Sequence, residues 1–354
     1  MWQLENRTPY AAQRSWVRAK DGEEIWLVAV KCSFDIRPDG TTAPSAEQPP
    51  VVMVPEYVGE PGRSSLRHDM DLVRTKTTTD VLLLGQAQAP RGKPVTELDV
   101  GFRVGPVVKR LRVTGDRVWQ GGAASAPLPF VTMPLVHERA YGGVDPASRH
   151  AACPQWDERN PVGTGFALSA SGIEGLRLPN VEYPDQLVKT WSDRPDPAAP
   201  GPVCAHWQPR LGLAGRYDDA WQQDRFPLLP ANFDDRHYQV APADQQAPRF
   251  LAGGEPVALV HLTPGGALQF ELPRVVLGLE TFFSDGERRH HDRPRLNTVI
   301  LEPELMRVSL VWHSALPCHP KVHKLLRTRV IEKRILSLGG GRGATEEEEE
   351  EEEA

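Results

Sequence analysis

The chain has 354 residues, of which 40% are hydrophobic and 25% are charged, so its composition is that of a globular protein and excludes a disordered one. The formal net charge is −6, but a run of eight glutamates at residues 346–353 supplies eight negative charges, and the remainder carries +2. A body this close to neutral lacks the basic stripe that binding to a nucleic-acid backbone requires.

The sequence predicts a cytoplasmic protein that does not insert into a membrane. Its four cysteines, Cys32, Cys153, Cys204 and Cys318, are widely spaced, which is typical of free thiols in a reducing compartment. The first residues show neither the apolar stretch nor the small-residue cleavage site of an export signal. The longest apolar runs have the length of a strand and fall far short of the roughly 18 residues that span a bilayer.

The first third of the chain shows the patterns of β-strands. Thirty glycines and 34 prolines predict many turns and short strands. Residues 24–36 form a buried apolar run that passes into alternation, and residues 80–89 form a second run of this kind. Residues 96–104 and 107–113 are apolar at every second position and are joined by a Gly-Pro corner, which predicts an antiparallel meander.

The pattern changes between residues 121 and 254, where apolar residues repeat neither at two nor at 3.6 positions. Four tryptophans in this segment favour an ordered but irregular insertion, with short helical turns near residues 218–223. Regular strands return at residues 256–262, 267–272, 274–281, 298–301 and 305–313. We therefore predict, for residues 1–320, a single domain that is an antiparallel β-sandwich-like body with a long insertion rich in Pro, Gly and Trp.

The composition shifts again after Pro320. Apolar residues in 321–338 recur at roughly helical spacing among lysines and arginines, which predicts a basic amphipathic helix. We expect residues 339–354, with their glycines and the glutamate run, to form a flexible tail. The basic segment could contact a membrane or nucleic acid, and neutralisation by the acidic run or binding to a partner is an equal alternative.

Motifs of catalysis are scarce. The chain has no Gly-x-Ser-x-Gly nucleophile turn and no phosphate-binding glycine loop with Lys-Ser/Thr. His313, Cys318, His319 and His323 offer imidazole and thiolate groups that can hold zinc, although no second pair with fixed spacing completes a tetrahedral set. A metal-dependent hydrolase that uses these four residues is therefore one alternative function.

The stretch 201–273 is the most unusual part of the sequence, because large aromatics alternate there with arginines and with many prolines. Such residues in irregular backbone suit a rigid platform, which either clamps the protein's own core or docks a partner. The candidate residues are Trp207, Arg210, Tyr217, Trp221, Arg225 and Phe226. A further alternative is a carbohydrate-binding β-sandwich in which exposed tryptophans stack on sugars.

Several short sequence motifs occur in one order along the chain and together suggest a family. They lie at residues 84–90, 113–119, 133–143, 160–166, 178–182, 207–230, 243–246 and 251–255. In this order they resemble a bacterial domain family of unknown function that is associated with type VI secretion as effector adaptors, or chaperones. The resemblance implies a non-enzymatic cytoplasmic protein of a Gram-negative bacterium, without cofactor or catalytic residues. Its implied partners are the spike-tip protein and a secreted effector.

Overall fold

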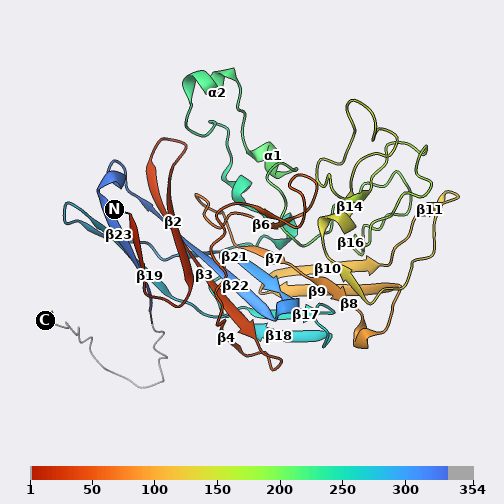
Figure 1. The fold of residues 1–354 in the computed structure, drawn as a ribbon, viewed down its shortest axis with the longest axis horizontal. Helices are drawn as coiled ribbons and strands as arrows, with labels where there is room; N and C mark the ends of the chain where they lie inside the picture. The colour runs from red at the N-terminus through yellow and green to blue at the C-terminus, as the bar shows by residue number, and fades with distance from the viewer. Residues whose placement is uncertain (1, 334–354) are drawn as a thin grey trace.

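The longest strand, β3 (Glu24–Ile36), has the bounds that the sequence predicts. The computed structural model describes residues 2–333 of the chain (Figure 1). Alternate side chains of β3 serve two interiors, which explains the unbroken apolar run. Trp26, Val28 and Val30 enter the main core, whereas Leu27 and Ala29 pack under the loop that follows the strand.

A six-stranded sheet forms around β3. Its strands are β2 (Ala11–Arg18), β3, β22 (Arg307–Pro317), β21 (Arg295–Glu302) and β7 (Asp80–Leu83) in that order, with β4 (Thr42–Pro44) paired to β3. All the pairings are antiparallel except that of β21 with β7, which is parallel. The sheet therefore joins segments from both ends of the chain.

A five-stranded antiparallel sheet contains the predicted meander. Its order is β16 (Val181–Glu182), β10 (Val107–Thr114), β9 (Glu97–Val104), β17 (Pro256–Val260) and β18 (Ala267–Glu271). Residues of β9 and β10 alternate between buried and exposed, so one face of the sheet enters the core. The predicted hairpin of β17 and β18 is also present.

A four-stranded sheet lies at one end of the molecule, and it contains a strand where the sequence predicts a C-terminal helix. Its order is β1 (Gln3–Asn6), β23 (Leu325–Glu332), β19 (Leu277–Phe283) and β20 (Arg288–His290). The predicted helix at residues 321–338 is wrong where the structure describes it, because residues 325–332 form β23, and 334–338 lie outside the described residues. Thr328 and Val330 point inward while Arg327 and Arg329 lie on the outer face, and β1 and β19 supply backbone partners on both sides.

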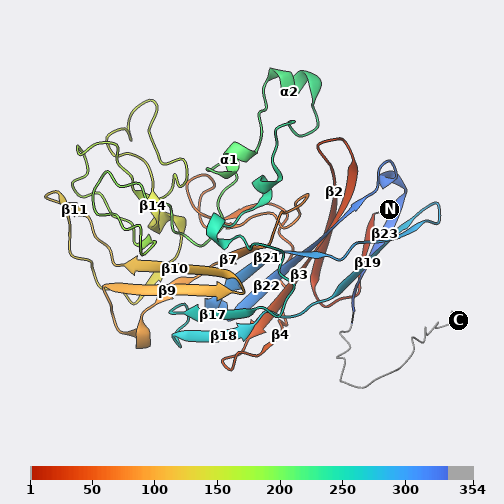
Figure 2. The ribbon, with the colours of Figure 1, turned by 180° about the vertical axis from the view of Figure 1, so that it is seen from behind.

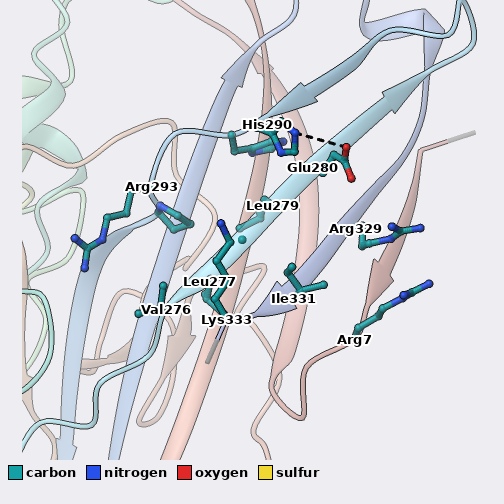
Figure 3. A pocket seen from close by; sticks show the side chains of 13 residues that line it. Arg7, Val276, Leu277, Leu279, Glu280, His290, Arg293, Arg329, Ile331 and Lys333 are labelled. Carbon is teal, nitrogen blue, oxygen red and sulfur yellow. Dashed lines mark ion pairs between the residues drawn. The ribbon is translucent and has the colours of Figure 1, made fainter. Parts of the chain in front are cut away.

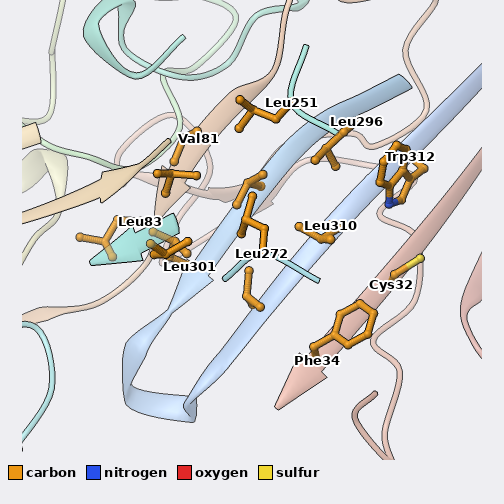
Figure 4. Packing of buried hydrophobic residues seen from close by; sticks show 14 of the residues in the cluster. Cys32, Phe34, Val81, Leu83, Leu251, Leu272, Leu296, Leu301, Leu310 and Trp312 are labelled. Carbon is orange, nitrogen blue, oxygen red and sulfur yellow. The ribbon is translucent and has the colours of Figure 1, made fainter. Parts of the chain in front are cut away.

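The three sheets share one hydrophobic core, and the prediction of a mainly β body is confirmed. Figure 4 shows Phe34 of β3, Leu310 of β22 and Leu301 of β21 packed together with Leu272, which follows β18. Side chains of β9, β10, β19 and β23 join the same cluster. Burial of this apolar surface is the main stabilising contribution to the body.

The remaining elements are short. Two- and three-residue strands form small ladders: β5 (Glu56–Tyr57) with β6 (Leu66–His68), β8 (Gln86–Gln88) with β13 (Thr132–Pro134), β11 (Trp119–Gln120) with β12 (Ala123–Ala124), and β14 (Tyr141–Gly142) with β15 (Thr164–Gly165). The α-helices in residues 2–333 are α1 (Arg210–Leu213) and α2 (Asp219–Asp224), the second at the predicted helical turns. Neither they nor any other helix in the described range is long and apolar enough to cross a membrane.

The irregular segment between β12 and β17 has an interior of its own and carries an arm. Its small core contains Tyr141 and Phe166, together with Trp119 of the preceding strand β11. This lobe lies at the opposite end of the long axis from β19 and β23 (Figure 1). The segment with α2 projects from the body between them, as Figure 2 also shows from behind.

Candidate protein-binding site

The projecting arm comprises residues 210–238, and its base is held by Arg210. The Arg210 side chain is buried, and its Nη1 donates to Asp69 Oδ2 at 2.7 Å and to the Val203 carbonyl at 2.6 Å. Its Nε donates to the His237 carbonyl at 2.9 Å, so a single guanidinium joins both ends of the arm to the body. A buried charge is stable only when it is paired and hydrogen-bonded in this way.

Trp207 secures the chain just before the arm. Its side chain is 1% exposed and packs with Leu66 and Cys204 in a small hydrophobic cluster. The His137 ring meets the indole edge-on, with 5.1 Å between the ring centroids. Complete burial lowers the pKa of His137 to about 4, so this imidazole is neutral at pH 7.

Arg225 ties the far part of the arm to the turn between β2 and β3. Its Nη2 donates to the Lys20 carbonyl at 2.6 Å and to the Leu229 carbonyl at 3.0 Å. In the reverse direction, Lys20 Nζ donates to the Phe233 carbonyl at 3.1 Å. These bonds hold the arm against the hairpin at a position more than 200 residues away in the sequence.

Local sequence explains why α2 forms at the tip. Asp218 caps the helix, since its Oδ1 accepts a hydrogen bond from the Trp221 amide at 3.0 Å. The helix ends after Asp224, where Phe226 is followed by Pro227, which has no amide hydrogen and cannot continue the helix. The short helix carries Trp221, and Tyr217 and Phe226 lie just before and just after it.

Tyr217, Trp221 and Phe226 form an aromatic triad on the arm. Trp221 lies between the other two rings, at centroid distances of 4.8 Å from Tyr217 and 5.7 Å from Phe226, both edge-on. Trp221 Nε1 donates to the Leu228 carbonyl at 2.8 Å, which fixes the indole. Tyr217 is nevertheless 54% exposed and Phe226 67% exposed. Rigid, exposed aromatics of this kind are typical anchors of protein interfaces.

Charged residues surround the aromatic triad. Arg216, Asp218, Asp219 and Asp224 are all exposed around it, and the exposed Leu211 lies near the base of the arm. An apolar centre with a polar rim is the usual anatomy of a protein–protein interface.

The structure thus separates the six residues that the sequence groups together. Trp207, Arg210 and Arg225 are clamps that make internal contacts, and the aromatic triad faces outward. The partners of the clamps, above all Asp69 and Lys20, cannot be recognised from the sequence. No local signal identifies them, because each contact spans more than 140 residues.

The four candidate zinc ligands are not brought together. His313 is buried in β22 and Cys318 is buried with its Sγ 3.5 Å from the Glu24 carbonyl oxygen, whereas His319 and His323 are exposed. Within residues 2–333 no group of three or more His, Cys, Asp or Glu side chains could hold a metal ion. The proposed cluster therefore does not form a zinc site in the part of the chain that the structure describes.

One titratable cluster lies where the irregular segment meets β10. Lys109 Nζ donates to Tyr183 Oη at 2.6 Å and to Asp244 Oδ1 at 3.0 Å. Burial lowers the pKa of Lys109 to about 8. Because the Lys109 side chain is 0% exposed, its amine is enclosed, and it joins the irregular segment to the five-stranded sheet.

Fold and site together define a mainly β protein that presents a clamped aromatic arm. The chain belongs to the family described as "uncharacterized protein conserved in bacteria (DUF2169)", whose model matches residues 21–313. The match includes the whole arm and both large sheets, except for all of β2 and the end of β22. No curated protein and no solved structure matches the chain. The resemblance to a bacterial domain family is confirmed, and its association with type VI secretion stays a prediction.

Proposed function

We propose that the protein is a non-enzymatic adaptor of type VI secretion, which binds a secreted effector in the bacterial cytoplasm and promotes its loading onto the spike-tip protein. The observation that carries the proposal is the aromatic triad, held rigidly and exposed on a clamped arm. The sequence resemblance supplies the identity of the partners, and the arm supplies a surface suited to bind one of them.

The energetics of association favour such a surface. A standard interface buries roughly 1,600 Å², and a few aromatic or arginine anchors contribute most of its affinity. Immobilising a side chain on binding costs about 0.5–1.5 kcal/mol. The Trp221 ring is already fixed by its hydrogen bond to Leu228 and by its two aromatic neighbours, so the arm avoids part of this cost.

The alternatives receive less support from the geometry. The hydrolase hypothesis needs His313, Cys318, His319 and His323 in one site, and they do not form one. For sugar stacking, Trp156 is 49% exposed, but among the described residues it is the only tryptophan with a largely exposed side chain. Sugar-binding platforms present flat, accessible rings, whereas Trp221 is only partly exposed and has Tyr217 and Phe226 packed against it.

Affinity purification from the bacterium that encodes the chain tests the proposal. A tagged full-length chain should capture a spike-tip protein and an effector, both identified by mass spectrometry. The Tyr217→Ala/Phe226→Ala variant should lose at least one of them. The matched control is Leu128→Ala/Leu305→Ala, which removes two exposed apolar side chains elsewhere. Capture of neither protein by the wild type, or equal capture by all three chains, would refute the proposal.

A further inference from the structure

The outer face of the four-stranded sheet has a cleft of about 860 Å³ that lies over β19 and β23 (Figure 3). An adjoining cleft of about 690 Å³ shares some of its lining residues, Arg7 and Lys333 among them. We call the two together the basic cleft, because five cations line it: Arg7, Arg274, Arg293, Arg329 and Lys333. Figure 3 shows Arg293 on one side, Arg7 and Arg329 on the other, and Lys333 between them.

The cations of the basic cleft exceed its local carboxylates. Arg7 and Arg329 both pair with Glu5, at 2.5 Å and 3.3 Å. Arg274, Arg293 and Lys333 are exposed and form no ion pair with any residue in the range 2–333.

The two remaining carboxylates at the cleft already have partners. Glu280 lies 3.8 Å from His290, and Glu332 accepts a hydrogen bond from Tyr10 Oη at 3.1 Å. Five cations therefore face three carboxylates, and the cleft is suited to an anionic ligand with several charges.

The floor of the basic cleft is low enough for an extended chain to lie on it. Gly278 of β19 faces Ile331 of β23, which is 37% exposed. A Cβ atom at Gly278 would lie 2.7 Å from Lys333 Cε, so the lysine stem crosses the glycine. This arrangement gives an apolar strip with cations on both sides, which is the complement of a polyanionic peptide.

The chain itself contains such a peptide. The glutamate run at residues 346–353 follows Lys333 after twelve intervening residues, and both segments lie in one polypeptide. Twelve extended residues span roughly 40 Å, which exceeds the distance needed to return to a cleft that Lys333 itself lines. A short tether gives an effective concentration of about a millimolar, so weak ion pairs suffice for occupancy.

We propose that the glutamate run docks in the basic cleft of its own chain, with its carboxylates against the five cations. The docked run covers the cationic face of β19 and β23 and excludes other acidic segments from it. The segment 334–354 lies outside the described residues, and the charge of the cleft, its shape and the short tether favour this docking. It does not depend on the adaptor function proposed above.

Fluorescence anisotropy with a labelled peptide of eight glutamates tests this docking at low salt. The wild-type chain should bind the peptide at least tenfold more weakly than a full-length variant whose eight glutamates are all replaced by glutamine, because its own run competes. Binding by the neutral-tail variant should disappear in 0.5 M salt, at a Debye length of roughly 4 Å. Equal binding by the two chains would overturn the proposal.

Cation substitutions in the neutral-tail variant locate the site. Arg293→Gln/Lys333→Gln should weaken peptide binding by about three- to thirtyfold, as expected for the loss of two exposed ion pairs. Arg110→Gln/Arg249→Gln removes the same charge at exposed positions elsewhere and should leave binding unchanged. Equal effects of the two pairs would overturn the assignment. Sedimentation completes the test, because a wild-type dimer that the neutral tail converts to a monomer would place the contact between chains and overturn docking within one chain.

Discussion

Replacing Arg210 by methionine tests whether the arm depends on its buried base. Methionine retains much of the volume of the side-chain stem but removes three hydrogen bonds and the counter-charge of Asp69, which is 12% exposed. Removing one partner of a buried pair typically costs about 3–5 kcal/mol. We expect the free energy of unfolding to fall by about 3 kcal/mol. This is the lower end of that range, because the partly exposed Asp69 carboxylate can be solvated by water once its partner is removed.

Urea denaturation followed by tryptophan fluorescence measures this loss. Arg216→Met is the matched control on the same arm, since Arg216 is exposed, and it should change the free energy of unfolding by less than about 0.5 kcal/mol. The double variant Asp69→Leu/Arg210→Met removes both charges and should recover at least half of the loss. A loss below about 1 kcal/mol in the single variant, or no recovery in the double variant, would refute the reasoning.

Three further changes test other parts of the molecule. Phe226→Ser should leave the urea midpoint nearly unchanged, since the ring is 67% exposed, and a clear decrease would show that it supports the fold. Gly115→Ala would press a Cβ against a facing backbone carbonyl and should lower the Tm by several degrees, whereas Gly265→Ala, with open space around it, should not; equal Tm values would contradict this. Lowering the pH from 6.5 to 4 should reduce the free energy of unfolding by up to about 3 kcal/mol each for His137 and His313. Burial depresses both pKa values to about 4, so the unfolded chain binds more protons in this window, and a constant urea midpoint would contradict it.

The parts of the fold that sequence predicted are those with an unambiguous period. The run in β3 and the alternation in β9 and β10 each admit one interpretation, and the structure has these strands within one residue of the predicted bounds. Residues 325–332 admit two interpretations. The spacing of the apolar positions fits a helix, whereas the alternation of Arg327 and Arg329 with Thr328 and Val330 fits a strand. Tertiary contacts decide between them: the Thr328 hydroxyl accepts from Trp26 Nε1 at 2.9 Å and bonds the Thr281 hydroxyl at 2.7 Å.

The first two strands, β1 and β2, were not predicted at all. Residues of β2 are half-buried along nearly the whole strand, so no alternation marks it. Its position depends on contacts such as that of Trp16 with Trp2, whose ring centroids are 6.2 Å apart. β1 pairs in parallel with β23, and a pairing between the two ends of the chain leaves no local signal.

The sequence predicts which residues make up the candidate site, but it does not predict which of them are buried and which are exposed. Trp207 and Trp221 look alike in sequence, each among prolines and arginines, yet one is enclosed and the other lies at the tip of the arm. The difference arises from partners that are distant in sequence, such as Asp69 for Arg210. Only the tertiary structure shows which aromatic residue is buried by contacts with residues distant in the sequence.

The clamps and the aromatic triad explain each other physically. Exposed rings on an unrestrained loop would fold back onto the body, because burying apolar surface is favourable. Arg210 and Arg225 prevent this by tying the arm at separate points, to Asp69 and to Lys20, so Tyr217 and Phe226 remain presented to solvent. The conformational entropy of the arm is therefore lost when the chain folds, and not when a partner binds. If the arm binds a partner as proposed, stability should depend on the clamps and affinity on the exposed rings, so substitutions at the two sets of residues should separate these properties.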